Sequence, residues 1–401
     1  MIEVEKAIEI VLANSKDFGV EKVSLSKSYG RVLRENIIAD RDFPPYNGVT
    51  MDGIAIKFDD YNNGVKKFEI EGIAAAGNPQ KELIQNNFCL EVMTGSIMPK
   101  GADTVIQYEH LEIKNNSAIL LDFDEKQNQN VHKKGFDRKK GDLIISEGTL
   151  IGSPEIGVLA TVGKNEVLVS KLPKTLIIST GDELVDVEEI PLPHQIRRSN
   201  VFRLKTALQK YKIEVDTAHL LDDYDQIVEK LKGYLNTYDL IMLSGGVSKG
   251  KFDFLPKALE ELGVEKLFHR IAQRPGKPFW FGVFENKKVV FAFPGNPISS
   301  FMSMQQYFTI WLEKSLQLNP KPKTYAVLGN DVFFKPDLTY YLEVKVDFSE
   351  KGEIIASPVK GNGSGDLANL VEADAFIVLP KGKTYFTKGE VYPILFFRNI
   401  L

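Results

Sequence analysis

The 401-residue sequence contains a single cysteine, Cys89. One cysteine excludes an intrachain disulfide framework and any cluster of cysteine metal ligands, and it suits a reducing compartment. We expect Cys89 to pack as a small hydrophobic side chain. The N-terminal segment has acids among its apolar residues and no signal-peptide core. No run approaches the roughly 18 apolar residues of a membrane span. We therefore expect a cytoplasmic protein that does not enter a membrane.

Neither sign of charge dominates, because the sequence has 50 basic and 54 acidic residues and a net charge of −4. This balance argues against electrostatic binding of nucleic acid. The five histidines show no metal-ligand spacing, which argues against a histidine metal site. There is no GxSxG motif and no sign of an acyl-transfer triad. With 43% apolar and 26% charged residues, a chain of this length predicts a soluble protein of two to four domains.

Helical patterns at the start of the chain return after a β-rich stretch. Apolar residues repeat at helical spacing over 3–14, and a second helix is expected over 26–35. A serine followed by a proline predicts another helix start at Ser153. We expect one helical or extended linker domain, formed by residues 1–45 and 140–172.

Between these segments, residues 46–139 are expected to form an inserted β-rich domain. Glycine, proline and asparagine separate short strand-like runs there, and the polar stretch 122–140 reads as a surface connection. The expected strands cover 67–73, 88–93, 104–108 and 118–123.

The pattern changes to alternating strands and helices over residues 173–320. Alternation of this kind predicts an α/β domain with a doubly wound parallel sheet and helices on both faces. After Pro320 and Pro322, residues 324–401 return to short strands and predict a C-terminal β domain. The expected strands of the central domain are 175–179, 213–218, 239–243 and 289–293, and its expected helices are 200–211, 225–235, 254–262 and 297–316.

Polar side chains follow the predicted strands of the central domain. Ligands of such folds bind at the carboxyl ends of the strands, and adjacent glycines let a phosphate approach the main chain closely. Carboxylates beside phosphate-binding loops imply Mg²⁺, because this cation prefers a few carboxylates together with phosphate oxygens. The candidate residues at the strand ends are Ser179, Thr180, Gly181, Asp182, Glu183, Asp222, Asp223, Ser244, Gly245, Gly246, Ser248, Asp253, Pro294, Asn296, Pro297 and Ser299.

Basic residues gather in the same domain. Arg270, Arg274 and Lys277 follow one another closely, with Arg197 and Arg198 upstream. Arginine binds oxyanions as a two-pronged fork and lysine as a point charge. Together with the acids, they predict a nucleotide-like or other polyanionic substrate with a divalent metal.

Each of these features also has a purely structural interpretation. Asp182 and Asp253 could cap helices, and the turn from Pro294 to Pro297 could serve only to end a strand and start a helix. The basic residues could form a solvated face. The functional interpretation depends on the coincidence of four strand-end loops that all carry such groups.

Six short motifs occur in the order found in one known family. They are MDG at 51–53, MTG at 93–95, TGDEL at 180–184, SGGVS at 244–248, PGKP at 275–278 and PGNPIS at 294–299. The chain thereby resembles the molybdopterin molybdenumtransferases, which include the bacterial MoeA proteins and the E domain of gephyrin. The resemblance spans nearly the whole chain.

The resemblance implies a linker unit, an inserted β-rich domain, a central α/β domain and a C-terminal β-barrel-like domain, assembled as a homodimer. It implies a reaction in which molybdate is inserted into adenylylated molybdopterin and AMP is released in the presence of Mg²⁺. Contact with other proteins of molybdenum cofactor biosynthesis is also possible.

The resemblance also assigns roles to individual residues. In the inserted part, Asp52 and Thr94 would contribute to the cleft, and Asp137 occupies an acidic position of the family. In the central domain, the functional acids would be Glu183, Asp222 and Asp253, with Asp182, Glu183 and Asp253 as metal ligands. The basic residues Arg270, Arg274 and Lys277 would hold phosphate or molybdate, and Ser299 could donate to an oxyanion.

The sequence departs from the family at several positions. NGVTMDG replaces the more usual NSAMDG, Lys249 stands where an apolar residue is common, and Arg198 stands where an acid is common. Extra positive charge could tighten phosphate binding or alter nucleotide preference. The C-terminal domain is a loose match. In the family it faces the partner subunit's central domain, which implies a site shared across the dimer.

Two other functions remain open at this point. One is a nucleotide-processing enzyme like the nicotinamide-nucleotide deamidases of the competence-damage type, against which the PGKP, PGNP and MDG motifs argue. The other is a non-catalytic scaffold like gephyrin, against which the acids Glu183 and Asp253 argue. The sequence does not distinguish molybdate from tungstate as the metal source.

Overall fold

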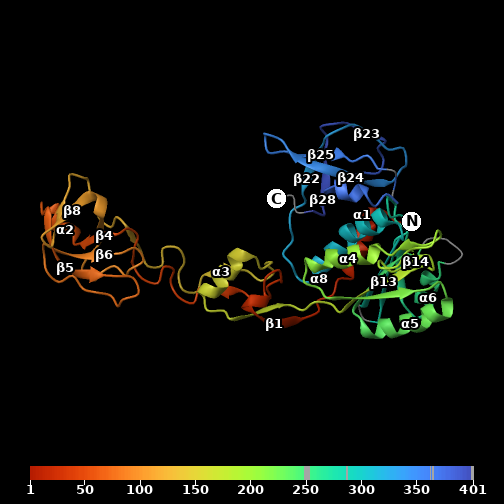
Figure 1. Ribbon diagram of the computed structural model, residues 1–401, viewed down its shortest axis with the longest axis horizontal. Coiled ribbons are helices and arrows are strands. Elements are labelled where there is room, and N and C mark those ends of the chain that lie inside the picture. The colour runs from red at the N-terminus through yellow and green to blue at the C-terminus, as the bar shows by residue number, and fades with distance from the viewer. Residues whose placement is uncertain (248–252, 286–287, 362, 364, 399–401) are drawn as a thin grey trace. The chain divides into compact units, whose positions relative to one another are not determined.

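The computed structural model describes residues 1–247, 253–285, 288–361, 363 and 365–398. The chain divides into two compact units (Figure 1). Within the described residues, no helix is both long and apolar enough to cross a membrane. The four domain boundaries expected from the sequence stay a prediction. The first unit comprises residues 1–35, 147–156 and 165–401, and the second comprises 36–146 and 157–164.

The second unit contains a six-stranded mixed sheet with the order β7-β4-β6-β5-β9-β8. All four strands expected there are present, with small shifts at their ends. The sheet strands are β4 (Gly53–Ile56), β5 (Lys67–Ala74), β6 (Phe88–Val92), β7 (Thr104–Gln107), β8 (Leu111–Lys114) and β9 (Ser117–Leu120). The remaining elements of this part are β2 (Ile37–Ile38), β3 (Gly48–Val49), α2 (Phe58–Asn62), η2 (Tyr108–His110), β10 (Val131–His132) and β11 (Leu143–Ile145).

Side chains on both faces of this sheet are buried. Ile54 and Ile106 pack on one face with Phe68, whereas Ala55 packs on the other. Cys89 is completely buried, and burial raises the pKa of its thiol to about 12. The cysteine therefore packs as a hydrophobic side chain, as expected from the sequence.

In the first unit, β1 (Val20–Ser24) pairs antiparallel with β12 (Glu166–Ser170). The prediction of a helix over 26–35 is wrong, because only the short 3₁₀ turn η1 (Leu25–Lys27) forms there. Gly30 adopts a left-handed conformation with φ of 77°, which ends any helix at that point. The helix expected to start at Ser153 is present as α3 (Ser153–Thr161).

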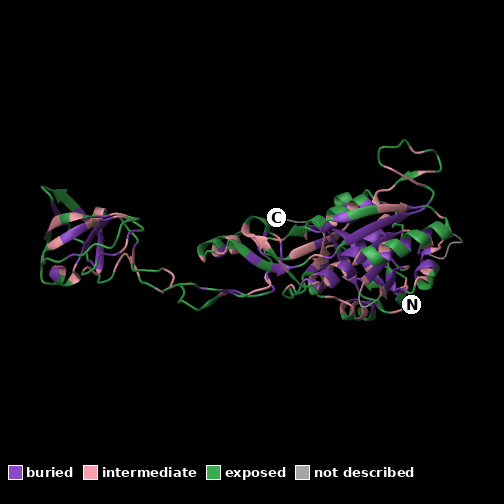
Figure 2. Cartoon of the chain, turned by 90° about the horizontal axis from the view of Figure 1, so that it is seen from below, coloured by how far each residue is buried: buried purple, intermediate pink, exposed green. Residues whose placement is uncertain are grey.

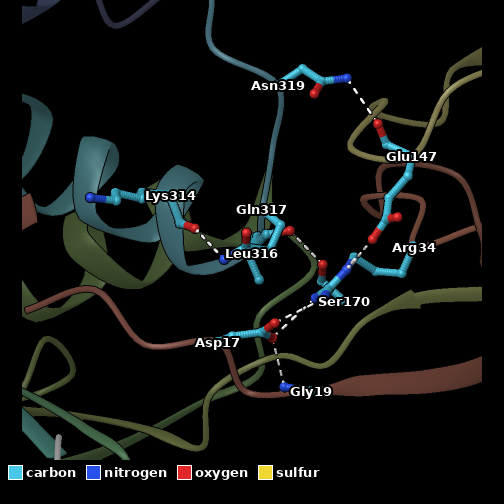
Figure 3. A network of polar contacts seen from close by, with 9 residues as sticks. All are labelled: Asp17, Gly19, Arg34, Glu147, Ser170, Lys314, Leu316, Gln317 and Asn319. Carbon is cyan, nitrogen blue, oxygen red and sulfur yellow. Dashed lines mark hydrogen bonds and ion pairs between the residues drawn. The ribbon is translucent and has the colours of Figure 1, made fainter.

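A polar network joins distant segments of the first unit (Figure 3). The Arg34 guanidinium forms ion pairs with Asp17 at 2.8 Å and with Glu147 at 3.1 Å. The Asn319 amide donates to the Glu147 carbonyl at 3.1 Å, and the Ser170 hydroxyl donates to the Leu316 carbonyl. These bonds tie the N-terminal segment to the end of the central domain.

The central domain has a six-stranded sheet with the order β16-β13-β17-β21-β20-β18. The first four strands are parallel, as predicted, and β20 and β18 add an antiparallel edge that the prediction missed. β20 and β21 are consecutive and pair directly, so no helix between them marks the strands in the sequence. The strands are β13 (Thr175–Thr180), β16 (Val215–Leu220), β17 (Leu240–Ser244), β18 (Glu265–His269), β20 (Trp280–Phe284) and β21 (Lys288–Phe293). A short pair, β14 (Leu184–Val185) and β15 (Ile196–Arg197), lies beside it.

Helices cover both faces of this sheet (Figure 1). On one face, α4 and α8 pack with α1 over Phe291, and on the other, α5 and α6 pack over Trp280. The sheet is buried, whereas the outer helix faces are exposed (Figure 2). The helices are α1 (Val4–Ala13), α4 (Asn200–Gln209), α5 (Tyr224–Thr237), α6 (Leu255–Glu261), α7 (Pro297–Ser303), the π-helical turn η3 (Met304–Phe308) and α8 (Thr309–Ser315).

The C-terminal part forms a closed five-stranded barrel. The strands run in the order β24-β25-β22-β28-β26, and β26 pairs back with β24. The strand β19 (Gln273–Arg274) of the central domain pairs with β24, and Tyr341 and Phe376 belong to the core beneath α8. The barrel is thus continuous with the central domain. Its elements are β22 (Tyr325–Leu328), β23 (Val332–Phe333), β24 (Thr339–Phe348), β25 (Ile354–Pro358), α9 (Asn369–Glu372), β26 (Ala375–Leu379), β27 (Tyr385–Phe386) and β28 (Val391–Phe396).

Candidate functional site

A cavity of about 830 Å³ opens at the carboxyl ends of the four parallel strands β13, β16, β17 and β21. The loops after these strands form its wall, and Leu338 of the C-terminal part also lines it. The structure therefore brings together most of the residues singled out in the central domain. Those that line the cavity are Ser179, Thr180, Gly181, Glu183, Arg197, Arg198, Asp222, Ser244, Gly245, Gly246, Asp253, Arg274, Lys277, Pro294, Asn296, Pro297 and Ser299.

Not every predicted residue reaches the cavity. Asp182 does not line it, but its carboxylate accepts a hydrogen bond from the Asp222 backbone at 2.9 Å and so supports the position of Asp222. Arg270 is also absent from the lining, and its Nε is buried without a hydrogen-bond partner. Ser248 and Lys249 lie outside the described residues. The roles assigned to these residues stay predictions.

Three carboxylates, those of Glu183, Asp222 and Asp253, line the cavity. Partial burial raises the pKa of Asp222, and the negative charges of Asp182, Glu183 and Asp253 raise it further. In the described part of the chain, no three potential ligands converge into a preformed metal cage. Mg²⁺ does not require one, because it binds through one or two carboxylates and completes its shell with substrate phosphates and water. The donor set fits that ion.

The repulsion at Asp222 leads to a stability prediction. A carboxyl group with a raised pKa in the folded state destabilises the fold above that pKa, and this cost is relieved as the pH falls. Asp222→Asn removes the charge, so we expect a gain of about 0.5 kcal/mol in unfolding free energy at neutral pH, discounted for solvent screening. Urea unfolding without added Mg²⁺ measures it. The gain should vanish near pH 4, and a loss of stability at neutral pH would contradict the account.

Two glycines shape the loop after β17. Gly245 and Gly246 have φ of 103° and 65°, a region that favours glycine. A Cβ on Gly245 would lie 2.8 Å from the Thr180 hydroxyl and 2.9 Å from its carbonyl oxygen. A Cβ on Gly181 would similarly lie 2.4 Å from a Glu183 carboxylate oxygen. These glycines let the strand-end loops approach each other closely.

We expect Gly245→Ala to cost about 2 kcal/mol of unfolding free energy, because it adds a steric clash to the backbone strain. It should also displace the loop and weaken anion binding. Gly389→Ala is the matched control, since Gly389 has φ of 93° and open space around it. That variant should lose only the unfolding free energy that corresponds to the backbone strain, about 1 kcal/mol. If chemical denaturation shows that Gly245→Ala and Gly389→Ala lose the same unfolding free energy, the close approach at Gly245 is contradicted.

Four basic residues line the cavity, namely Arg197, Arg198, Arg274 and Lys277. The Arg274 guanidinium lies 5.9 Å from the centre of the Phe334 ring, within the range of a cation–π interaction. Arg198, one of the departures from the family, forms an ion pair with Asp186. This ion pair compensates part of the Arg198 charge, and Arg198 itself lines the cavity.

Three residues that sequence reasoning missed connect the loops. The Asn200 amide donates to the Ser244 hydroxyl at 2.9 Å and to the Gly295 carbonyl at 2.7 Å. Gln273, which is fully buried, donates to the Gly276 carbonyl at 3.1 Å and accepts from the Tyr307 hydroxyl. Arg203 also bonds to the loop that begins at Pro294. Only the position of Asn200 at a helix start after two arginines gave a signal in the sequence.

The other two serines of the site have different surroundings. Ser299 is buried at the start of α7 and lines the cavity, as its predicted role requires. Ser179 shares a hydrogen bond of 2.9 Å with His219 Nδ1. Burial lowers the pKa of His219, so the imidazole is neutral at pH 7.

In the second unit, Asp52 and Thr94 form a local pair. The Asp52 carboxylate accepts from the Thr94 backbone at 2.6 Å and from its hydroxyl at 2.8 Å. The backbone bond, followed by the hydroxyl bond, lowers the pKa of Asp52. Asp137 lies 3.1 Å from His132 Nε2. The pairing of Asp52 with Thr94 links the MDG and MTG motifs, and contact of these residues with a substrate stays a prediction.

Comparisons with known proteins cover the chain almost completely. The MoeA N-terminal region (domain I and II) matches residues 2–163, a probable molybdopterin binding domain matches 176–314, and the MoeA C-terminal region (domain IV) matches 325–397. Molybdopterin molybdenumtransferase from Synechocystis sp. is 39% identical over 98% of this chain and 99% of its own length. The Staphylococcus epidermidis protein of the same name is 30% identical over 98% of this chain and 95% of its own length. The crystal structure of the molybdopterin biosynthesis moeA protein from Pyrococcus horikoshii OT3 superposes with a TM-score of 0.83 at 27% identity, covering 99% of this chain and 100% of that one. The chain therefore belongs to the MoeA family of molybdopterin molybdenumtransferases.

Proposed function

We propose that this protein inserts molybdate into adenylylated molybdopterin and releases AMP in the presence of Mg²⁺. The observation that carries the proposal is one cavity lined by both acids and cations. Glu183, Asp222 and Asp253 provide the acids, and Arg274 and Lys277 provide the cations. A substrate with phosphates, used together with a tetrahedral dianion, requires both.

The cations and the glycine loop would bind the anionic groups of the substrates. Lys277 offers a point charge to phosphate or molybdate, and Arg274 offers two parallel donors. Gly245 and Gly246 allow main-chain N–H groups to approach a phosphate closely. The buried Ser299 hydroxyl could donate to an oxyanion. These groups would hold the substrates in the cavity that the acids also line.

Glu183 and Asp253 would hold Mg²⁺ or activate water. The bound cation would supply positive charge between carboxylates and phosphates, which otherwise repel each other. The repulsion that already raises the pKa of Asp222 supports this assignment. Molybdenum itself would be captured by the sulfurs of the substrate, consistent with a chain whose single thiol is buried.

The wider assignments rest on family membership. We propose that the protein is a cytoplasmic homodimer, that Asp52, Thr94 and Asp137 act in the same reaction, and that it contacts other proteins of molybdenum cofactor biosynthesis. Analytical ultracentrifugation measures the dimer directly.

Incubation of the protein with adenylylated molybdopterin, molybdate and Mg²⁺ tests the proposed reaction. AMP release that requires both molybdate and Mg²⁺ is expected. A parallel incubation with nicotinamide mononucleotide tests the deamidase alternative, for which ammonia would be released. Ammonia without any AMP release would overturn the proposal, and the absence of both products would leave only the scaffold alternative.

A further inference from the structure

Arg203 of α4 is a partly buried arginine whose hydrogen-bond partners are all neutral. One nitrogen, Nη2, donates to the Pro297 carbonyl at 2.6 Å, to the Ser300 hydroxyl at 2.9 Å and to the Asn200 side-chain oxygen at 2.9 Å. The other two nitrogens, Nε and Nη1, are buried with no hydrogen-bond partner. Within the described part of the chain, no carboxylate forms an ion pair with this guanidinium.

An arrangement of this kind is costly for the protein alone. A buried charge normally has an opposite charge beside it, because desolvation is otherwise uncompensated. Burial lowers the pKa of Arg203 to about 10, so the guanidinium still carries its charge at pH 7. The Arg203 guanidinium also lies 5.1 Å from the centre of the Phe301 ring, within the range of a cation–π interaction. The positive charge is therefore held without its usual compensation.

The charge lies directly behind the wall of the cavity. Two of its bonded partners, Asn200 and Pro297, line the cavity. Asn200 in turn bonds to Ser244 and to the Gly295 carbonyl, which lie at the ends of two neighbouring strands. Arg203 thus supports α4, the loop after β17 and the loop after β21 at the point where these three meet.

We infer that Arg203 is a positioning residue for the anionic substrate. It fixes the wall formed by Asn200, Ser244 and Pro297, and its uncompensated positive charge favours an oxyanion bound on the other side of that wall. The inference rests on the proposed function for the identity of the anion, a tetrahedral dianion such as molybdate. The guanidinium acts through its neighbours and through its field, without touching the substrate.

Isothermal titration calorimetry with molybdate on variants of Arg203 distinguishes the effect of the charge on affinity from the effect of the hydrogen bonds. Arg203→Met and Arg203→Gln both remove the charge, and the glutamine retains an amide that can still donate to the Pro297 carbonyl. We expect either variant to raise the Kd for molybdate about tenfold, whereas Arg203→Lys, which keeps the charge, should stay within about threefold. If the methionine variant does not fold, the glutamine variant gives the same comparison.

Arg31→Gln is the matched control. Arg31 is a buried arginine that forms an ion pair with Glu21, donates to the Ser170 carbonyl and does not line the cavity. Its replacement should lower the melting temperature and leave the Kd for molybdate unchanged.

Three results would overturn the inference: an unchanged Kd in Arg203→Gln, equal weakening in the lysine and glutamine variants, or no molybdate binding by the parent protein. Molybdate binding that depends on Arg203, found in a protein that releases no AMP, would refute the proposed reaction while supporting the inference.

Discussion

Replacing Glu183 by glutamine, or Asp253 by asparagine, is expected to lower kcat/KM for AMP release by about 10³-fold. Both carboxylates line the cavity beside Asp222, and the amides keep their size while removing the charge that would hold Mg²⁺ or activate water. Losses of this order are typical when one preorganised charged group is removed from a reaction site. Steady-state measurement of AMP release at saturating Mg²⁺ gives the values directly.

The matched control for this pair is Asp223→Asn. Asp223 follows Asp222 directly, but its carboxylate caps α5 by accepting from the Gln226 backbone at 3.1 Å, and it does not line the cavity. Asparagine caps helices about as well as aspartate, so both stability and activity should be nearly unchanged. Circular dichroism and gel filtration should show all three variants folded like the parent. Parental rates in both Glu183→Gln and Asp253→Asn would remove these acids from the reaction.

Lys277→Ala should produce the second largest effect, a loss of about 10²-fold in kcat/KM that arises mainly from a higher KM for molybdate. Lys277 lines the cavity, and a charge-assisted bond to an anion in a partly enclosed site contributes about 2–3 kcal/mol. The substitution leaves the backbone bond from Ile271 to the Lys277 carbonyl in place, so the loop should keep its conformation. Initial rates over a range of limiting molybdate concentrations measure the effect.

Lys266→Ala is the comparison for Lys277. Lys266 lies on β18 in the same sheet, and its exposed side chain pairs with Glu260. A surface ion pair contributes little to stability, so this variant should behave like the parent. Unchanged kinetics in Lys277→Ala at limiting molybdate would exclude its ammonium group from anion binding.

The parts of the fold that follow from local patterns were predictable. Each of the four parallel strands of the central sheet is followed within two residues by a glycine or a polar residue, and the strands alternate with helices. Both their existence and their common edge therefore follow from the sequence. The antiparallel strands β18 and β20 were missed because a direct strand-to-strand connection leaves no intervening helix. The helix expected over 26–35 failed because apolar spacing alone does not reveal that Gly30 adopts a left-handed turn.

Site residues that closely follow a strand could be predicted from the sequence. Residues whose role depends on how helices pack could not. Glu183, Asp253 and the two glycines at 245 and 246 were found in this way. Charge and the family resemblance together selected Arg270 as a ligand, although it does not line the cavity, and neither gave a reason to select Arg203. Whether an arginine has an acidic partner depends on packing between α4 and α7, which no short sequence motif encodes.

The central claim is that acids and cations from loops distant in the chain bind one metal-bridged, anionic nucleotide. A crystal structure with AMP and Mn²⁺, in which the anomalous signal of Mn²⁺ marks the Mg²⁺ position, tests it most directly. The account predicts an anomalous peak bonded to the Glu183 and Asp253 carboxylates, with the AMP phosphate between the metal and Lys277. A metal peak away from both carboxylates, or AMP bound outside the cavity, would contradict it.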